Sequence, residues 1–425
     1  MKTIAIIGGG VTGVTTAYAL AKRGFAVTVL ERHRYAAMET SYANGGQLSA
    51  SNAEVWNHRS TIGKALQWLL RGDAPLLVHL HPTWHKLSWF AEFIGAMPHY
   101  HDNTIALARM AVGARAHLFQ WAAEEGIEFD LQQRGILHLH RDREEFDHAV
   151  TVSKLLARAG VPRRAVTPDE MRAIEPALQG DYYGGHYTES DSSGDIHKFT
   201  TGLAQAAQRH GAQLRYNQQV VQLRAGSGGV DVTVLQGDGA DTSRYDAVVI
   251  CAGAASRDLA AQLGDNVNVY PVKGYSVTLQ LDDAASRAAA PNVSLVDDTV
   301  KLVCSRLGAD RLRVAGTAEF HGQNRDIRAD RIAPLTAWVQ QNFPDISTRN
   351  ITPWAGLRPM MPDLMPRVGP GKAPGVFYNT GHGHLGWTLS AATAESVASA
   401  IAAGHDAPQT PAAAPLEQVK AQPSA

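Results

Sequence analysis

The sequence TIAIIGGGVTGVTTAYALAKRGFAVTVLE occupies residues Thr3–Glu31 and determines the architecture of the chain's first part. The short apolar run Thr3–Ile7 predicts a buried strand, and a glycine-rich turn follows it at Gly8–Gly13. Apolar residues at helical spacing predict a helix over 12–22, and Phe25–Leu30 predicts a second strand. A strand, a helix and a strand in this order predict a parallel sheet.

The glycines of the turn have the spacing of a dinucleotide-binding fingerprint. Gly8 allows the tight turn, Gly10 lets a pyrophosphate approach the backbone, and Gly13 lets helix and strand pack closely. The helix N-terminus offers free N–H groups to phosphates, and Glu31 follows the second strand, where a carboxylate accepts hydrogen bonds from ribose hydroxyls. The fingerprint predicts an ADP moiety and leaves open whether it belongs to FAD or NAD. The candidate binding residues of this unit are Gly8, Gly10, Val11, Gly13, Glu31 and Arg32.

Composition excludes several classes of protein. The chain has 425 residues, with 39 Lys and Arg against 40 Asp and Glu, so a net charge of −1 gives no electrostatic case for a nucleic-acid partner. Two cysteines cannot form a disulfide framework. An apolar fraction of 44% with 19% charged residues predicts a packed core and excludes general disorder. No apolar run reaches the roughly 18 residues of a membrane span, and no signal-peptide core is found, so we expect a cytoplasmic location.

Four further stretches carry a family resemblance. They read ETSYANGGQLS at 39–49, PVKGYS at 271–276, WAGLRP at 354–359 and NTGHGHLGWT at 379–388. Together with the fingerprint, this set resembles the D-amino-acid dehydrogenase members of the D-amino-acid oxidase/glycine oxidase family of FAD-dependent oxidoreductases. The resemblance extends from Met1 to about Ala403.

The resemblance implies an α/β chain, α+β overall, with two interleaved domains. One is a doubly wound, Rossmann-like FAD-binding domain, and the other is a substrate domain built on a large mixed β-sheet with helices. We expect the FAD-binding domain at 1–60, 188–265 and 348–404, and the substrate domain at 61–187 and 266–347. The Ala- and Pro-rich residues 405–425 predict a flexible tail.

The resemblance also implies which residues contact the flavin. In the family, the segment after Glu39 runs beside the isoalloxazine near N5, and the glycine-rich approach to the last helix lies under the flavin. Gly45 and Gly46 would let the backbone approach a flat ring, and a helix N-terminus stabilises a reduced flavin. Val220 or Val221 is placed like the family residue that meets adenine. We expect non-covalent FAD, contacted by Ser41, Asn44, Gly45, Gly46, Gln47, Leu48, Val221, Ala252, Gly253, Gly381, His382, Gly383, Leu385, Gly386, Trp387 and Thr388.

Arg358 is the first candidate for binding the substrate. It lies between apolar neighbours, where a guanidinium needs a carboxylate partner, and the family's carboxylate-binding arginine occupies this place. Lys273 and Tyr275 share one face of a strand over 271–281, but alternation leaves open which face points inward. Tyr275 could add a hydrogen bond to the carboxylate, and His384 could face cofactor or substrate. Arg358, Tyr275 and His384 are therefore the catalytic candidates.

The implied reaction is oxidation of D-amino acids to 2-oxo acids and ammonia, with hydride transfer from Cα to flavin N5. Electrons would pass to a quinone or another respiratory carrier. Alternatives are a secondary amine acid of the sarcosine, D-proline or hydroxyproline type as substrate, or an oxidase that uses oxygen. A flavin-binding protein without turnover is not favoured, because Arg358 and the flavin segments are both present.

The histidine pairs and one apolar helical segment are weaker indications of function. Histidine pairs at His79/His81, His99/His101, His138/His140 and His382/His384 lack a metal-binding motif around them, so we expect no metal site. Apolar residues recur at helical spacing over Trp84–Met97, on one face at Trp84, Leu87, Phe90, Ala91 and Ile94 and on another at Trp89, Phe93 and Met97. Two apolar faces favour burial, and a peripheral contact with the inner face of the cell membrane is the alternative. The oligomeric state has no signal in the sequence.

Overall fold

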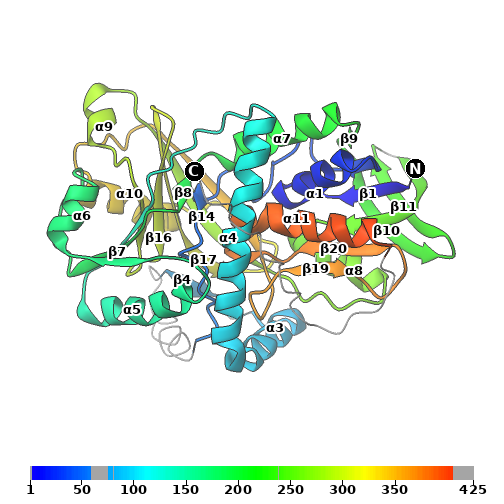
Figure 1. The fold of residues 1–425 in the computed structure, drawn as a ribbon, viewed down its shortest axis with the longest axis horizontal. Coiled ribbons are helices and arrows are strands. Elements are labelled where there is room, and N and C mark those ends of the chain that lie inside the picture. Colours follow the sequence, from blue (N-terminus) through cyan, green and yellow to red (C-terminus); the bar gives the residue numbers. More distant parts are fainter. Residues whose placement is uncertain (1, 59–74, 80, 238, 405–425) are drawn as a thin grey trace, which may run out of the picture.

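Two large sheets lie side by side in the molecule (Figure 1), and the long helix α4 (Tyr100–Glu124) runs between them. The computed structural model describes residues 2–58, 75–79, 81–237 and 239–404. The flexible tail expected at 405–425 therefore lies outside the described residues.

The first sheet is mostly parallel and contains the strands predicted from the glycine-rich unit. β1 pairs in parallel with β2 on one side and β13 on the other, and β20 extends the parallel set beyond β13. The strands are added on either side of β1, which is a Rossmann-like strand order, and the predicted α/β fold class is confirmed. In spatial order the strands are β19 (Arg367–Pro370), β20 (Val376–Thr380), β13 (Ala247–Ile250), β1 (Thr3–Ile7), β2 (Ala26–Leu30) and β9 (Gln213–Arg215).

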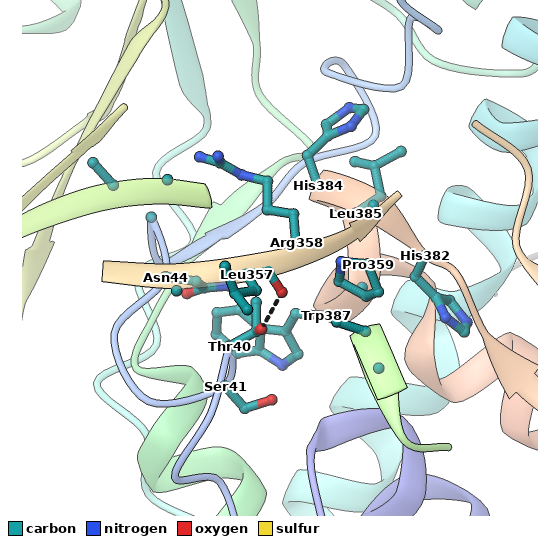
Figure 2. Close-up of a pocket in the computed structure, with 18 of the residues that line it drawn as sticks. Thr40, Ser41, Asn44, Leu357, Arg358, Pro359, His382, His384, Leu385 and Trp387 are labelled. Atoms are coloured by element: carbon teal, nitrogen blue, oxygen red, sulfur yellow. Dashed lines mark hydrogen bonds between the residues drawn. The ribbon is translucent and has the colours of Figure 1, made fainter. Parts of the chain in front are cut away.

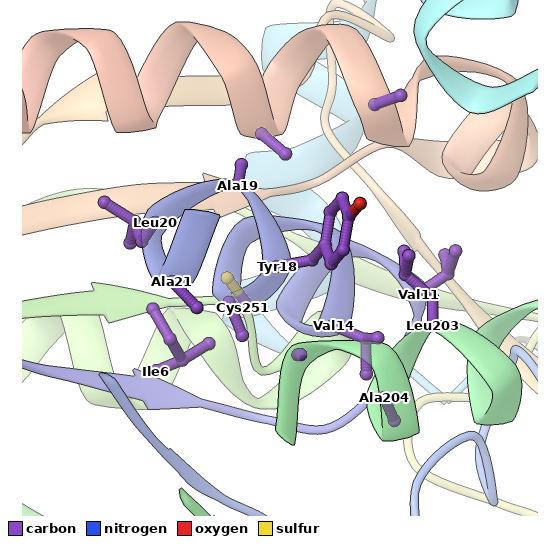
Figure 3. Packing of buried hydrophobic residues seen from close by; sticks show 14 of the residues in the cluster. Ile6, Val11, Val14, Tyr18, Ala19, Leu20, Ala21, Leu203, Ala204 and Cys251 are labelled. Atoms are coloured by element: carbon purple, nitrogen blue, oxygen red, sulfur yellow. The ribbon is translucent and has the colours of Figure 1, made fainter. Parts of the chain in front are cut away.

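Helices cover one face of this sheet, and a smaller sheet covers the other. On the helical side, Ile6 of β1 lies under α1, and Tyr18 and Leu20 pack in the same apolar cluster as Leu203 of α7 (Figure 3). On the other face, the antiparallel strands β10–β12 pack valines against β1 and β13. The elements are α1 (Val11–Lys22), α7 (Ile196–Arg209), α11 (Gly386–Ala402), β10 (Gln219–Gly226), β11 (Gly229–Gln236) and β12 (Gly239–Tyr245).

At Gly8 and Gly13 the structure shows why the turn requires glycine. Gly8 has a φ of +107°, a conformation that side-chain-bearing residues avoid. A Cβ added at Gly13 would lie 1.9 Å from the Gly8 carbonyl oxygen, so only glycine lets α1 lie this close to the turn after β1.

The second sheet has nine strands and is mixed. Most neighbours are antiparallel, while β15 with β5 and β17 with β4 are parallel. α10 (Ala329–Asn342) packs Leu335 and Val339 against its apolar face. In spatial order the strands are β18 (Ile351–Met360), β14 (Tyr270–Gln280), β17 (Arg311–Phe320), β16 (Leu302–Leu307), β15 (Ser294–Asp297), β5 (Ile136–His140), β7 (Gly184–Thr188) and β6 (Arg164–Val166), with β4 (Leu76–Val78) beside β17.

The remaining elements are short or peripheral. β3 pairs with β8 in a two-stranded sheet, and short 3-10 turns precede α4, α8 and α11. They are β3 (Gln47–Leu48), β8 (Ser192–Ser193), α3 (Trp84–Gly95), α5 (Arg143–Ala157), α6 (Pro168–Ile174), α8 (Ser256–Gln262), α9 (Ala284–Ala289), η1 (Met97–His99), η2 (Gly253–Ala255) and η3 (Gly383–Leu385). Within the described ranges, no helix is both long enough and apolar enough to cross a membrane.

One strand bears on the expected domain boundaries. β18 lies at the edge of the second sheet, paired along its whole length with β14, although the sequence assigned 348–404 to the FAD-binding domain. The division into domains stays a prediction, and β18 is the segment on which its last boundary depends.

Candidate active site

A cavity of about 980 Å³ lies where the two sheets meet. Its wall includes residues that follow the carboxyl ends of β1, β2, β13 and β20, which is where open parallel sheets bind ligands. Strands β14 and β18 of the second sheet form another part of the wall, together with the segment before α11.

The part of the cavity formed by the glycine-rich turn and Glu31 has groups that can bind a ribose and a phosphate. Buried Glu31 accepts hydrogen bonds from the backbone N–H of Gly9 at 2.6 Å and of His33 at 2.8 Å, which fixes the carboxylate at the rim. Gly10 is the N-cap residue of α1 and has no side chain that could cap the helix. The Ser41 hydroxyl accepts a hydrogen bond from the N–H of Val11 at 3.0 Å. A carboxylate beside the N-terminus of a helix fits the ribose and phosphate of the ADP part of a dinucleotide.

The segment around Asn44 is held by the second sheet. The Ser276 hydroxyl of β14 donates to the Ala43 carbonyl, and the Ser305 hydroxyl of β16 donates to the Gly45 carbonyl, both at 2.8 Å. A Cβ at Gly45 would lie 2.4 Å from a methyl group of Val303. We expected a glycine here because the backbone would approach a flat ring. In the structure, Gly45 is required because the backbone packs closely against β16.

The segment before α11 forms another wall of the cavity. Gly381 and Gly383 both have positive φ, and the Thr388 hydroxyl accepts from the backbone N–H of Ser49 at 3.2 Å. His382 is buried and bonds through Nε2 to Thr393 at 3.0 Å, and burial lowers its pKa to about 3. In Figure 2, the His382 ring lies well away from the Arg358 guanidinium.

Most of the predicted cofactor residues line the cavity, and three do not. Gly13 faces Gly8 inside the unit, Leu48 is buried in β3 beside β8, and a Cβ at Gly46 would lie 3.0 Å from the Gly194 carbonyl. The predicted residues that line the cavity are Gly8, Gly10, Val11, Glu31, Arg32, Ser41, Asn44, Gly45, Gln47, Val221, Ala252, Gly253, Tyr275, Arg358, Gly381, His382, Gly383, His384, Leu385, Gly386, Trp387 and Thr388.

Arg358 extends from β18 toward the cavity, on the same side of the strand as His384 (Figure 2). Its Nη1 donates to the Thr317 carbonyl at 2.9 Å, and no carboxylate of the described residues pairs with it. Burial lowers the pKa of Arg358 to about 10, so the group is charged at neutral pH. A half-buried cation without a counter-charge is a strong site for an anionic ligand.

The space for this guanidinium comes from a glycine and a β-bulge. A Cβ at Gly274 on β14 would lie 2.1 Å from Arg358 Nη1. The register between β14 and β17 shifts between Lys273 and Tyr275, and Thr317 lies in this bulge with a φ of +63°. A β-branched residue in this region is strained, and the bulge turns its carbonyl toward Arg358.

The structure settles which face of β14 points inward. Gly274 faces Arg358, so by alternation Lys273 and Tyr275 face the opposite side. The Tyr275 hydroxyl donates to Glu319 at 2.6 Å, and Lys273 Nζ lies 3.4 Å from the same carboxylate. Tyr275 contributes to the cavity wall, but its hydroxyl hydrogen is committed to Glu319 rather than to the space in front of Arg358.

His384 is fixed at the wall near Arg358. Its Nε2 lies 3.0 Å from the Asn52 carbonyl, which can only accept, so Nε2 carries the proton. The ring stacks on Trp56 with centroids 5.1 Å apart. Burial lowers the pKa of His384 to about 4, so the ring is neutral at physiological pH.

A possible metal-ligand group lies on the other face of β14. In the described part of the chain, ligand atoms of His79, Glu319 and His321 lie within 4.8 Å of one another. Glu319 already pairs with Lys273, and Arg328 lies 3.5 Å from its other oxygen. A metal ion would add positive charge beside two cations, so the absence of a metal site remains our prediction.

Sequence reasoning missed Gly274 and Thr317, and it missed a charged end of the cavity around Glu54 and Arg163. Gly274 lies inside a quoted motif but attracted attention only through its neighbours Lys273 and Tyr275. The others come from separate elements and lie in no local motif, so only their assembly in space reveals them.

The comparisons with known proteins agree with this geometry. The family model described as FAD dependent oxidoreductase matches residues 3–400, and the chain belongs to this family. It is 57% identical over 403 residues to a Mesorhizobium japonicum protein named D-amino acid dehydrogenase 3, covering 95% of this chain and 97% of that one. It is 40% identical to the D-amino acid dehydrogenase of Dechloromonas aromatica, covering 96% and 99% of the two chains.

Solved structures show the same fold. Glycine oxidase from Geobacillus kaustophilus superimposes with a TM-score of 0.74 at 23% identity, covering 96% of each chain. L-proline dehydrogenase from P. horikoshii also gives 0.74, at 19% identity, covering 95% of this chain and 94% of that one. The predicted family, fold class and FAD dependence are therefore confirmed.

Proposed function

We propose that the chain is a dehydrogenase that oxidises D-amino acids to 2-oxo acids and ammonia. The observation that carries the proposal is Arg358, a half-buried guanidinium without a carboxylate partner among the described residues, in a cavity that begins at the dinucleotide fingerprint. The names of the two relatives at 57% and 40% identity support D-amino acids as the substrate class.

In this proposal the chain's own residues bind and orient the substrate. Two N–H groups of Arg358 take the α-carboxylate side by side, which fixes the direction of the Cα–H bond. Bound FAD supplies the two-electron acceptor for the hydride. Arg358 stays charged throughout, and neutral His384 adds no second charge beside the amine. Tyr275 contributes to the wall and donates its hydroxyl hydrogen to Glu319 rather than to the substrate.

We further propose that FAD is held without a covalent bond. Cys304 is fully buried in the second sheet's core and is not part of the cavity wall. Cys251 contributes to the wall, but burial raises its pKa to about 12, so its thiol stays protonated and a poor nucleophile.

We propose a quinone or another respiratory carrier as electron acceptor, with a peripheral contact at the membrane. The support is an apolar face of α3, where Trp84 is 80% exposed and Leu87 and Ile94 are each 54% exposed. Contact would depend on apolar burial rather than on charge, because the net charge is −1.

The test is anaerobic mixing of the purified holoenzyme with D- and L-amino acids while the flavin absorbance is followed. D-isomers should bleach the flavin and L-isomers should not. A quinone analogue should then reoxidise it far faster than air does, and acid precipitation should leave the flavin in the supernatant.

Arg358→Met should lower kcat/KM for D-alanine by at least about thirtyfold, the cost of removing one partner of a buried charge pair. Flavin reduction by L-isomers alone, or a kcat/KM of Arg358→Met equal to that of the wild type, would contradict the proposal. Rapid, stoichiometric hydrogen peroxide formation in air would instead favour an oxidase.

A further inference from the structure

A group of charged residues lines another part of the same cavity, which we call the distal chamber. Its wall includes Glu54, His138, Arg163, Asp298 and Lys301. These residues come from separate parts of the chain, the segment after β3, β5, the loop before β6 and the turn between β15 and β16.

The half-buried acidic groups of the distal chamber already have partners. Glu54 accepts from the Tyr100 hydroxyl at 2.6 Å and lies 3.1 Å from His148 Nε2. Asp298 lies 3.0 Å from His138 Nδ1 and pairs with Lys301 at 3.4 Å. These carboxylates and the Lys301 ammonium are therefore compensated within the chain.

Two histidines of the chamber, His138 and His140, add no positive charge. Burial lowers the pKa of His138, and it lowers that of His140 to about 3. Both rings are neutral at the pH at which an amino acid would bind.

Arg163 is different from the other cation of the chamber. Lys301 has Asp298 as its ion-pair partner, whereas Arg163 has no hydrogen bond and no ion pair among the residues that the structure describes. Its Nε is buried and unsatisfied, and burial lowers the pKa of the guanidinium while Asp298 and Glu54 oppose that shift from a distance. Such a group needs hydrogen-bond acceptors, which the surrounding side chains do not provide.

Arg358 and Arg163 are thus two guanidinium groups of the cavity wall that have no carboxylate partner among the described residues. We infer that Arg163 forms a second anion site, which binds the side-chain carboxylate of an acidic D-amino acid whose α-carboxylate lies on Arg358. This deepens the proposed function and rests on it, since it assigns a side-chain preference to the same cavity. The forked guanidinium suits the two oxygens of a carboxylate. A carboxamide offers it one acceptor oxygen and no negative charge.

The experiment compares matched ligands on the holoenzyme. D-glutamate is compared with D-norvaline, which has the same chain length without the second carboxylate, by kcat/KM for anaerobic flavin reduction. Glutarate is compared with pentanoate, which has the same chain length, by their dissociation constants, read from the perturbation of the flavin spectrum. In the wild type, the second carboxylate should improve both quantities by about tenfold or more, the worth of one charge-assisted hydrogen bond.

Arg163→Met should abolish both preferences, and Arg163→Lys should keep part of them. Arg164→Met is the control, because this neighbouring arginine is exposed, pairs with Glu170 at the surface and does not line the cavity. It should leave both ratios unchanged. Flavin content and melting temperature establish that each variant is folded.

The two proposals fail differently. If D-alanine reduces the flavin but glutarate binds no tighter than pentanoate, the Arg163 site is wrong and the proposed function stands. If the glutarate preference exists and depends on Arg163 while no D-amino acid reduces the flavin, the second anion site stands and the proposed function is wrong. Wild-type preferences in Arg163→Met would also overturn the assignment.

Discussion

Arg358 keeps its position through two uncharged neighbours. Gly274 leaves the volume that the guanidinium occupies, and the Thr317 carbonyl takes one of its N–H groups. The remaining donors of Arg358 have no partner among the residues that the structure describes, which leaves them available to a carboxylate. The sequence predicted Arg358 from its motif but neither neighbour, because both contacts join strands that are distant in the chain.

Gly274→Ala should therefore weaken substrate binding without removing any charge. A Cβ 2.1 Å from Nη1 forces Arg358 out of its place, and we expect KM for D-alanine to rise by about tenfold or more while FAD content stays at the wild-type level. Steady-state kinetics with a quinone analogue measures this.

Gly95→Ala is the matched control, since a Cβ at this helical position meets nothing within 4 Å. It should leave KM unchanged. A KM in Gly274→Ala equal to that of the wild type would show that Arg358 does not need this space.

At the scale of single elements, α3 shows what helical periodicity resolves and what it does not. The apolar pattern of Trp84–Met97 predicted a helix, and the structure has one over Trp84–Gly95. Trp89 is buried and donates from Nε1 to the Met360 carbonyl at 2.9 Å, whereas Trp84 is exposed. Spacing alone could not distinguish these faces, because burial depends on β18 and β14, which come much later in the chain.

The exposed face of α3 gives the third prediction. Trp84→Ser combined with Leu87→Ser should lower the fraction of protein that sediments with phosphatidylcholine–phosphatidylglycerol vesicles, because the change removes apolar area from the contact. Flavin reduction by D-alanine should be unaffected, since neither residue lines the cavity.

Leu235→Ser is the control for this measurement. Leu235 is 41% exposed but lies on β11, in the small sheet that covers the first sheet. Equal sedimentation of the α3 double variant and the control would exclude this face as the membrane contact.

At the scale of the whole molecule, buried neutral histidines make stability depend on pH. Burial lowers the pKa of His140, His186 and His382 to about 3 and that of His384 to about 4. In the unfolded chain these groups titrate near pH 6.5, so between about pH 6.5 and 4 the unfolded state binds more protons. Their contribution to stability is complete above pH 6.5 and decreases as the pH falls below it.

We therefore expect the free energy of unfolding to fall steeply from pH 6.5 to pH 5, by roughly 1.4 kcal/mol per pH unit for each histidine that stays neutral in the fold. The midpoint of urea unfolding, followed by tryptophan fluorescence at several pH values, measures the slope. His186→Gln should reduce it. A stability that is constant from pH 7 to pH 5 would show that these rings are protonated in the folded protein.

Much of the fold followed from local sequence, and the rest required long-range pairing. The glycine-rich unit, α3 and the last helix were predicted because periodicity and turn chemistry act within a few residues. The position of β18 beside β14, and the union of Arg163 with Arg358 in one cavity, depend on register between distant strands. No periodicity within a segment encodes that register.

The strand order of the first sheet determines when this sheet can form while the chain is being synthesised. β1 emerges among the first residues, but its neighbour β13 begins at Ala247 and β20 at Val376. The second sheet runs from Leu76 to Met360, so the nascent chain contains all its strands before the first sheet can close. The segment before α11, which forms part of the cavity wall, is synthesised last, and a chain released before Thr388 would carry the β14 and β18 part of the wall without this segment.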